Sequence, residues 1–178
     1  MKLMRSIILI SFVGILQNSF AQKFIESYYN YGWKEVVSID EASYYGYALN
    51  TDSGWYRMDF ILHHPKNKIQ MSGLYKDKEN KIKNGVFKWY YFNGNLKTYG
   101  KYIENRKEGL WLNWYSNGSL ADSLTYKDGQ LVGINKSWYK NDFLKDSLSL
   151  DENGNGIYTA WFDDSSPSEA GRYKNYKK

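Results

Sequence analysis

A tandem repeat with a period of about 24 residues constrains this chain more than any other feature of its sequence. In each copy a glycine is followed by an aromatic pair five and six residues later. A turn dipeptide follows eight and nine residues after the same glycine. The anchor glycines are Gly85, Gly109, Gly133 and Gly156. The aromatic pairs are Tyr90-Tyr91, Trp114-Tyr115, Trp138-Tyr139 and Trp161-Phe162, and the turn dipeptides are Asn93-Gly94, Asn117-Gly118, Asn141-Asp142 and Asp164-Ser165. Agreement at several independent positions indicates a repeat architecture.

Each copy is predicted to be a β-hairpin followed by a second, looser turn. Asn-Gly between alternating apolar residues is a strong hairpin signal, because both central positions of a type I′ turn need positive φ. A period of this length suffices for two strands of about seven or eight residues and two turns. Eighteen Tyr, seven Trp and only two Pro also favour strands. We therefore expect an all-β fold: one elongated, single antiparallel sheet of tandem β-hairpins.

The first 21 residues have the pattern of a signal peptide. Lys2 and Arg5 precede an apolar stretch, residues 7–16, that is too short to span a bilayer. Small residues before Gln22 predict cleavage at that point, which would place the protein in the periplasm, in the cell envelope or outside the cell. The alternative is a leader that stays uncleaved as a membrane anchor; after cleavage we expect no membrane span.

The remaining chain, residues 22–178, is predicted to form a single repeat domain. Residues 54–178 fit the hairpin repeats, with a longer connection at 76–84. Residues 22–53 are aromatic but do not follow the period. Because a repeat array must cover its open ends, we interpret 22–53 as an atypical N-terminal cap.

The charge distribution argues against a polyanionic partner such as nucleic acid. Removing the leader leaves 22 Lys or Arg against 19 Asp or Glu, a net charge of +3. The charge is uneven, since residues 66–108 carry 11 Lys or Arg against 4 Asp or Glu. A solvated, lysine-rich sheet edge explains this excess best, because such lysines prevent edge-to-edge aggregation. A basic binding face is the alternative.

The copies, written G-x4-W-Y-x-N-G-x-L and followed by Y-x-x-G, resemble the MORN-repeat variant of the YwqK-like antitoxin family. Residues 33–47 and 71–75 resemble the N-terminal section of exported, Bacteroidetes-type members of that family. The resemblance implies stacked β-hairpins and binding to a protein, which for the antitoxin is a toxin. Two departures stand out: this chain has an export leader, and its last copy has DDSSPS where Asn-Gly belongs, which predicts a degenerate or capped hairpin.

No enzyme is predicted from these residues. The chain has no Cys and therefore no thiol nucleophile or disulfide. His63 and His64 are adjacent, so on a strand they face opposite sides and cannot chelate one metal together. Residues 151–156, DENGNG, match the start of a calcium loop, but its twelfth position is Phe162 instead of Glu. We expect no catalytic residue, no metal and no cofactor.

Alternation along the strands assigns the two members of each aromatic pair to opposite faces. The first members, with Leu110 and Leu112 beside Trp114, are expected on the buried face. The second members are expected on a polar and aromatic face of the kind that interfaces use. The predicted partner-binding residues are Tyr91, Trp111, Tyr115 and Tyr139. The predicted structural positions are the four anchor glycines, Trp114, Trp138, Trp161, and the pairs Asn93-Gly94 and Asn117-Gly118.

These features favour a non-enzymatic repeat protein that mediates protein–protein interaction in the cell envelope or outside the cell. The partner is expected to be a toxin, giving an immunity role, or an envelope protein. The alternative is a carbohydrate-binding module of an exported protein, because exposed aromatic side chains stack on sugars as well as on proteins.

Overall fold

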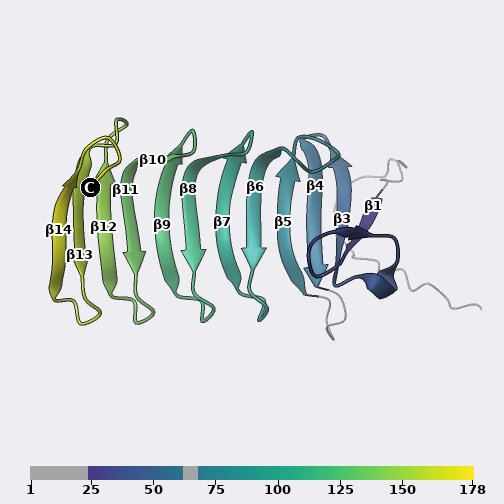
Figure 1. Ribbon diagram of the computed structural model, residues 1–178, viewed down its shortest axis with the longest axis horizontal. Coiled ribbons are helices and arrows are strands. Elements are labelled where there is room, and N and C mark those ends of the chain that lie inside the picture. The colour runs from purple at the N-terminus through teal and green to yellow at the C-terminus, as the bar shows by residue number, and fades with distance from the viewer. Residues whose placement is uncertain (1–23, 62–67) are drawn as a thin grey trace, which may run out of the picture.

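The structure is a computed structural model that describes residues 24–61 and 68–178 (Figure 1). The strands lie side by side in one open antiparallel sheet, which forms a single curved layer along the long axis of the molecule. The all-β prediction and the single sheet are confirmed. The predicted signal peptide and both histidines lie outside the described residues.

The N-terminal part of the sheet precedes the regular repeats. Its strands are β1 (Phe24–Tyr29), β2 (Glu35–Val36), β3 (Tyr44–Thr51), β4 (Gly54–Ile61) and β5 (Ile69–Tyr75). A single 3-10 turn, η1 (Ile39–Glu41), joins β2 to β3. β1 pairs with β3, and β2 lies outside β1 at the sheet edge. The expected meander in chain order therefore starts only at β3.

The repeats supply the rest of the sheet. Their strands are β6 (Lys83–Tyr90), β7 (Leu96–Ile103), β8 (Arg106–Trp114), β9 (Leu120–Lys127), β10 (Gln130–Leu131), β11 (Gly133–Trp138), β12 (Leu144–Leu150), β13 (Gly156–Trp161) and β14 (Pro167–Tyr173). They follow one another in chain order, apart from the short β10, which pairs with β9 alone.

The hairpins form where the turn dipeptides predicted them, but the turn type differs from the prediction. The amide of Gly94 donates to the carbonyl of Tyr91, and Gly94 has a φ of 92°, whereas Asn93 is not among the positive-φ residues. This geometry is a type I turn followed by one left-handed residue, so the type I′ prediction was wrong. Asn93 instead accepts the amide of Asn95 through its side chain, as Asx turns do.

The last hairpin forms the same turn as the others and is not degenerate. The amide of Ser165 donates to the carbonyl of Phe162 at 3.0 Å, and Ser165 takes the left-handed position with a φ of 68°. Asp164 accepts the amide of Ser166 at 2.8 Å, in the role that Asn93 has in the first copy. A short polar residue in the Asx position is enough for this turn.

The core is a row of aromatic rings on one side of the sheet, which we call the aromatic face. It carries Tyr75, Phe87, Trp89, Tyr102, Trp111 and Tyr126. Phe87 is fully buried because its ring lies over Gly73 of the neighbouring strand, where an added Cβ would lie 2.2 Å from ring carbons. Gly100 accommodates Trp111 in the same way. Glycine on one strand thus makes room for a ring on the next.

This packing reverses part of the predicted assignment of faces. Trp111 was expected on the exposed face but is 2% exposed, and Leu110 was expected on the buried face but is 51% exposed. The opposite face also exposes Val86, Ile134 and Ile157. The prediction failed because both faces contain apolar residues. The face that becomes buried is the one on which large rings find glycine on the adjacent strand.

Candidate binding face

The rings of the aromatic face contact one another from strand to strand. Phe87 lies 5.0 Å from Tyr75 and 5.3 Å from Tyr102, measured between ring centroids. Trp111 lies 4.8 Å from Tyr102 and 6.2 Å from Tyr126. Most of these pairs are edge-to-face, an arrangement that stabilises aromatic clusters beyond the burial of their area. The rings of this row therefore present few open faces.

Two lysines lie over this row. The Lys83 ammonium is 4.9 Å from the Tyr102 ring centroid and also lies near Phe87. The Lys107 ammonium is 4.5 Å from Trp111 and 4.6 Å from Tyr126. Among the described residues neither lysine forms an ion pair, and partial burial lowers the pKa of Lys83. Cation–π attraction compensates part of the lost hydration but supplies no countercharge.

A cleft of about 370 Å³ opens beside Lys107. Its lining combines rings, amide and hydroxyl groups and ammonium groups on one surface. The lining residues are Gln70, Trp89, Tyr90, Lys97, Thr98, Tyr102, Lys107, Trp111 and Asn113. The buried side-chain oxygen of Gln70 has no hydrogen-bond partner among the described residues.

A row of polar side chains continues from the cleft toward the C-terminal end of the sheet. Thr98 donates to the Asn113 side-chain oxygen at 2.8 Å, and Ser137 donates to Asp146. Asp122 lies between them on β9. Burial raises the pKa of Asp122, and the Asp146 carboxylate raises it further. The aromatic face is thus basic near β6 and β8 and acidic near β9 and β12.

Three of the four predicted binding residues link the hairpin turns of successive copies, which lie at one end of the strands. The hydroxyl of each tyrosine donates to a backbone carbonyl in the next copy. The bonds run from Tyr91 to Trp114 at 2.7 Å, from Tyr115 to Trp138 at 2.7 Å and from Tyr139 to Trp161 at 3.0 Å. Asn93 adds a bond to the Ser116 carbonyl at 2.7 Å. These tyrosines therefore have a structural contact that single-copy reasoning missed.

The fourth predicted residue, Trp111, lies in the middle of the aromatic row and lines the cleft. Its Nε1 donates to the Lys101 carbonyl at 3.2 Å. None of the three predicted tyrosines, Tyr91, Tyr115 and Tyr139, is among the residues that line this cleft. Lys83 and Lys107, which the prediction missed, each stand two residues before an anchor glycine, so their shared place in the repeat could have identified them.

The predicted structural positions lie in the strands and turns of the repeats. Of the anchor glycines, three have positive φ, and the fourth, Gly156, is so close to Ser149 that an added Cβ would lie 1.8 Å from its carbonyl oxygen. Trp114, Trp138 and Trp161 end their strands at positions where the pairing register shifts. All are partly buried.

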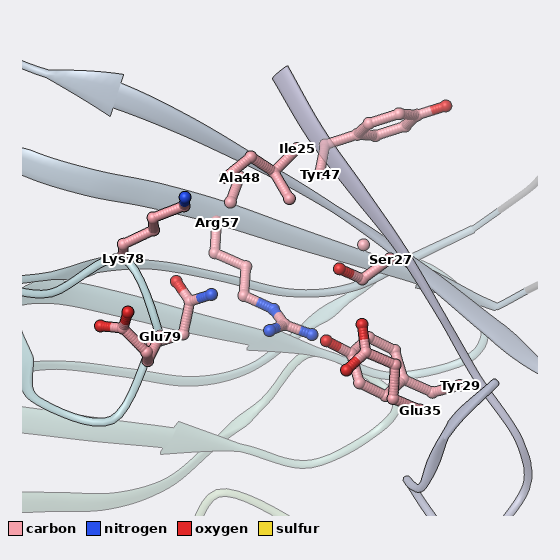
Figure 2. Close-up of a pocket in the computed structure, with 11 residues that line it drawn as sticks. Ile25, Ser27, Tyr29, Glu35, Tyr47, Ala48, Arg57, Lys78 and Glu79 are labelled. Carbon is pink, nitrogen blue, oxygen red and sulfur yellow. The ribbon is translucent and has the colours of Figure 1, made fainter. Parts of the chain in front are cut away.

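A smaller hollow of about 200 Å³ lies at the N-terminal end of the sheet (Figure 2). Lys78 and Glu79, from the long connection after β5, approach Arg57 of β4 there. The Arg57 Nε bonds to Asp59 at 2.8 Å, and both side chains are largely buried over Gly46. This ion pair lies within β4 and packs against β3.

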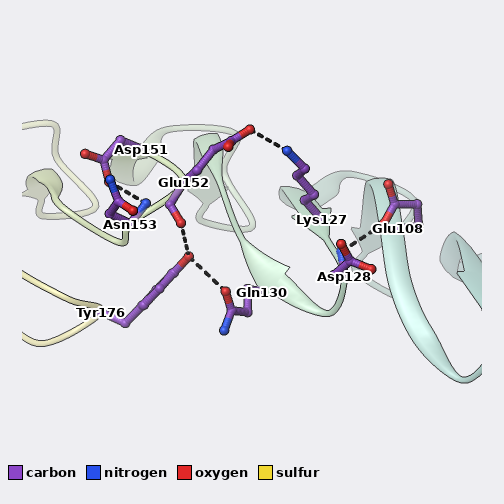
Figure 3. Close-up of polar contacts among 8 residues, drawn as sticks. All are labelled: Glu108, Lys127, Asp128, Gln130, Asp151, Glu152, Asn153 and Tyr176. Atoms are coloured by element: carbon purple, nitrogen blue, oxygen red, sulfur yellow. Dashed lines mark hydrogen bonds and ion pairs between the residues drawn. The ribbon is translucent and has the colours of Figure 1, made fainter.

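The calcium-loop look-alike after β12 is a turn. Asp151 accepts the amides of Asn153 and Asn155 through its Oδ1 atom, which lowers its pKa. The C-terminal segment packs on this turn, and the Tyr176 hydroxyl contacts both Gln130 and the Glu152 carbonyl at 3.2 Å (Figure 3).

Among the described residues no three His, Cys, Asp or Glu side chains cluster as metal ligands, and no helix is long and apolar enough to cross a membrane.

Comparison with known families supports the repeat assignment. The MORN repeat variant matches residues 83–104 and 107–128. These are the two copies in which Lys83 and Lys107 lie over aromatic rings. MORN repeats are generally protein-interaction or membrane-binding modules. No curated protein and no solved structure matches the chain.

Proposed function

We propose that this protein is an exported, non-enzymatic binding module, and that a partner protein lies on the aromatic face between β5 and β9. The observation that carries the proposal is the cleft beside Trp89, Tyr102 and Trp111, with Lys107 in its lining. The Lys107 ammonium donates to the Tyr126 hydroxyl at 3.4 Å but forms no ion pair among the described residues. Aromatic rings surrounded by polar groups are typical of protein interfaces. The partner is an envelope protein or a toxin; in the second case the module confers immunity.

The geometry favours a protein over the carbohydrate alternative. Sugars bind to open ring faces, but Trp111 is almost completely buried and Lys107 covers its ring at 4.5 Å. The neighbouring rings pack edge-to-face, so they also turn little of their π-surface outward. A polypeptide needs no such platform, because its side chains insert between rings and its acidic groups pair with ammonium groups.

Site-specific photo-crosslinking in the producing cells tests this proposal. Lys97 lines the cleft and is the extra residue at the bulge where the register between β6 and β7 shifts. Lys101, on the same strand, is exposed on the opposite face, where it pairs with Val86. A crosslinker at position 97 should capture a defined protein, whereas one at position 101 should not. Mass spectrometry of the product identifies a toxin or an envelope protein. Capture from position 101 alone, or a glycan adduct at 97, would contradict the proposal.

Cell fractionation tests the predicted export. The protein should be found in the periplasmic, envelope or extracellular fraction, with an N-terminus at Gln22. A product that retains the leader and stays in the cytoplasm would contradict this part of the proposal.

A further inference from the structure

We propose that the occupant of the aromatic face is an extended, acidic segment of a protein that crosses the strands and carries Asp or Glu at every third position. The inference rests on the proposed binding function and names the chemistry of the partner. Its acidic side chains pair with Lys83 and Lys107, and its other residues pack against the rings between them.

Charge is the first support. Lys83 and Lys107 occupy the same place in successive copies, each over the rings of its own repeat. Neither forms an ion pair among the described residues. A cation held partly out of water without a countercharge is unfavourable, so an acidic side chain arriving at this place is stabilised.

The fold itself shows how an acid completes such a site. In the last copy the Lys178 ammonium lies 4.7 Å from the Tyr158 ring, and Glu169 on β14 pairs with it. Ring, lysine and carboxylate are all present there. The first two copies have the ring and the lysine, but no carboxylate of the described residues pairs with either lysine, and the inferred segment supplies it.

Spacing is the second support. Lys83 is on β6 and Lys107 on β8, two strands apart, which at strand spacings of about 4.8 Å is about 10 Å. A polyproline II segment repeats every three residues with a rise of about 3.1 Å, so residues three apart face the same way about 9.3 Å apart. In a β-strand, same-face residues are about 6.7 Å apart and fall out of register. An acidic polyproline II segment therefore matches the lysines.

The acidic part of the face limits the segment. Asp122 and Asp146 lie beyond β8 and repel an acidic chain. Within the cleft Lys97 of β7 adds positive charge. The segment is therefore expected to cover β6 to β8, which is the region with the basic excess.

Peptide binding to the full chain, purified after export, tests the inference. The probe is a peptide of about four Glu-Pro-Pro triplets, which favours polyproline II. The controls are the same peptide with Gln for Glu and a peptide of alternating Glu and Pro. We expect binding of the first peptide that weakens with salt, and affinities at least about tenfold lower for both controls.

Variants locate the site. Lys83→Gln and Lys107→Gln should each weaken binding about three- to tenfold, and Lys107→Arg should keep most of it because the charge remains. Lys88→Gln and Lys101→Gln, exposed on the opposite face, are matched controls that should not change binding. Circular dichroism checks that every variant is folded, and a Gln variant that unfolds is replaced by the Met variant, which keeps an unbranched side chain over the rings but removes the charge.

Several results would overturn the inference. Equal binding of the Gln peptide would show that binding does not depend on the negative charge of the peptide. Equal binding of the alternating peptide would refute the three-residue spacing of its acidic side chains. Binding of anionic vesicles or of an acidic polysaccharide at Lys83 and Lys107, without peptide binding, would assign the face to another partner class. The crosslink from position 97 is independent of these outcomes. A captured protein without any peptide binding would therefore contradict the acidic segment but leave the proposed protein-binding function standing.

Discussion

Replacing Gly100 with alanine tests the packing of the aromatic face directly. Gly100 lies on β7 beneath Trp111, and an added Cβ would lie 2.2 Å from the Cδ2 atom of that ring. The ring cannot move away freely, because its Nε1 bonds to the Lys101 carbonyl and Tyr102 packs against it. Gly100 has no positive φ, so the effect is steric and does not come from backbone strain.

The magnitude follows from three contributions. Overpacking a well-filled site costs about 1–3 kcal/mol. Displacing the ring from its bond to the Lys101 carbonyl costs about 1 kcal/mol more. Alanine restricts the unfolded chain and returns about 0.4–1 kcal/mol. We therefore expect Gly100→Ala to lower the free energy of unfolding by about 1–3.6 kcal/mol, and the melting temperature by about 2–14 °C.

Urea unfolding followed by circular dichroism and tryptophan fluorescence measures this effect. Gly171→Ala is the matched control, because Gly171 holds the equivalent place on β14 and an added Cβ would meet only the Lys178 side chain, at 3.5 Å. The control should change the free energy of unfolding by less than about 0.5 kcal/mol.

A double-mutant cycle decides whether the clash is the cause. In a Trp111→Leu background the ring is gone, so Gly100→Ala should cost less than about 1 kcal/mol there. If the alanine costs the same with and without the Trp111 ring, the proposed packing of rings over glycine is wrong.

Three further substitutions test other contacts. Tyr115→Phe removes one turn-to-turn bond and should cost about 1 kcal/mol in urea unfolding. Gly154→Ala combines a φ of 74° with a clash against the Tyr176 ring, so hydrogen exchange of β14 should become faster. Asp122→Asn should stabilise the protein by about 0.5 kcal/mol at neutral pH. Burial and Asp146 raise the pKa of Asp122, so the native wild type loses stability as pH rises from the unfolded to the folded pKa, and the variant should lack this decline.

The sequence predicted the hairpins because each copy contains its own strand and turn signals. It did not distinguish the turn type, since Asn-Gly suits both a two-residue turn and a type I turn that ends in a left-handed residue. The buried face also escaped prediction. Whether Trp111 or Leu110 lies inside depends on Gly100 in the neighbouring strand, and that neighbour is known only when the pairing register is known.

The candidate site was predicted in part, for a related reason. The sequence predicted binding by aromatic residues on a face that also carries polar side chains, and Trp111 does line the cleft. Tyr91 and Tyr115 have hydroxyls that reach the next copy, a contact that appears only when copies are stacked. The lysine excess was ascribed to a solvated edge, but two of those lysines lie on rings, which no single-strand pattern reveals.

The third copy shows that ring and lysine are linked. Asn135 takes the place that Phe87 and Trp111 hold in the first two copies, and Leu131 takes the place of the lysine. Asn135 is buried, and its amide group bonds to the Thr125 amide and the Val132 carbonyl, so it fills the site as a backbone cap. Packing alone would allow a lysine to remain above Asn135, or a ring to remain beside Leu131. Their joint loss here is expected when the two side chains serve one site for an acidic group. In the last copy Gly154 takes the place of the lysine, and the ammonium over Tyr158 comes instead from Lys178, which pairs with Glu169.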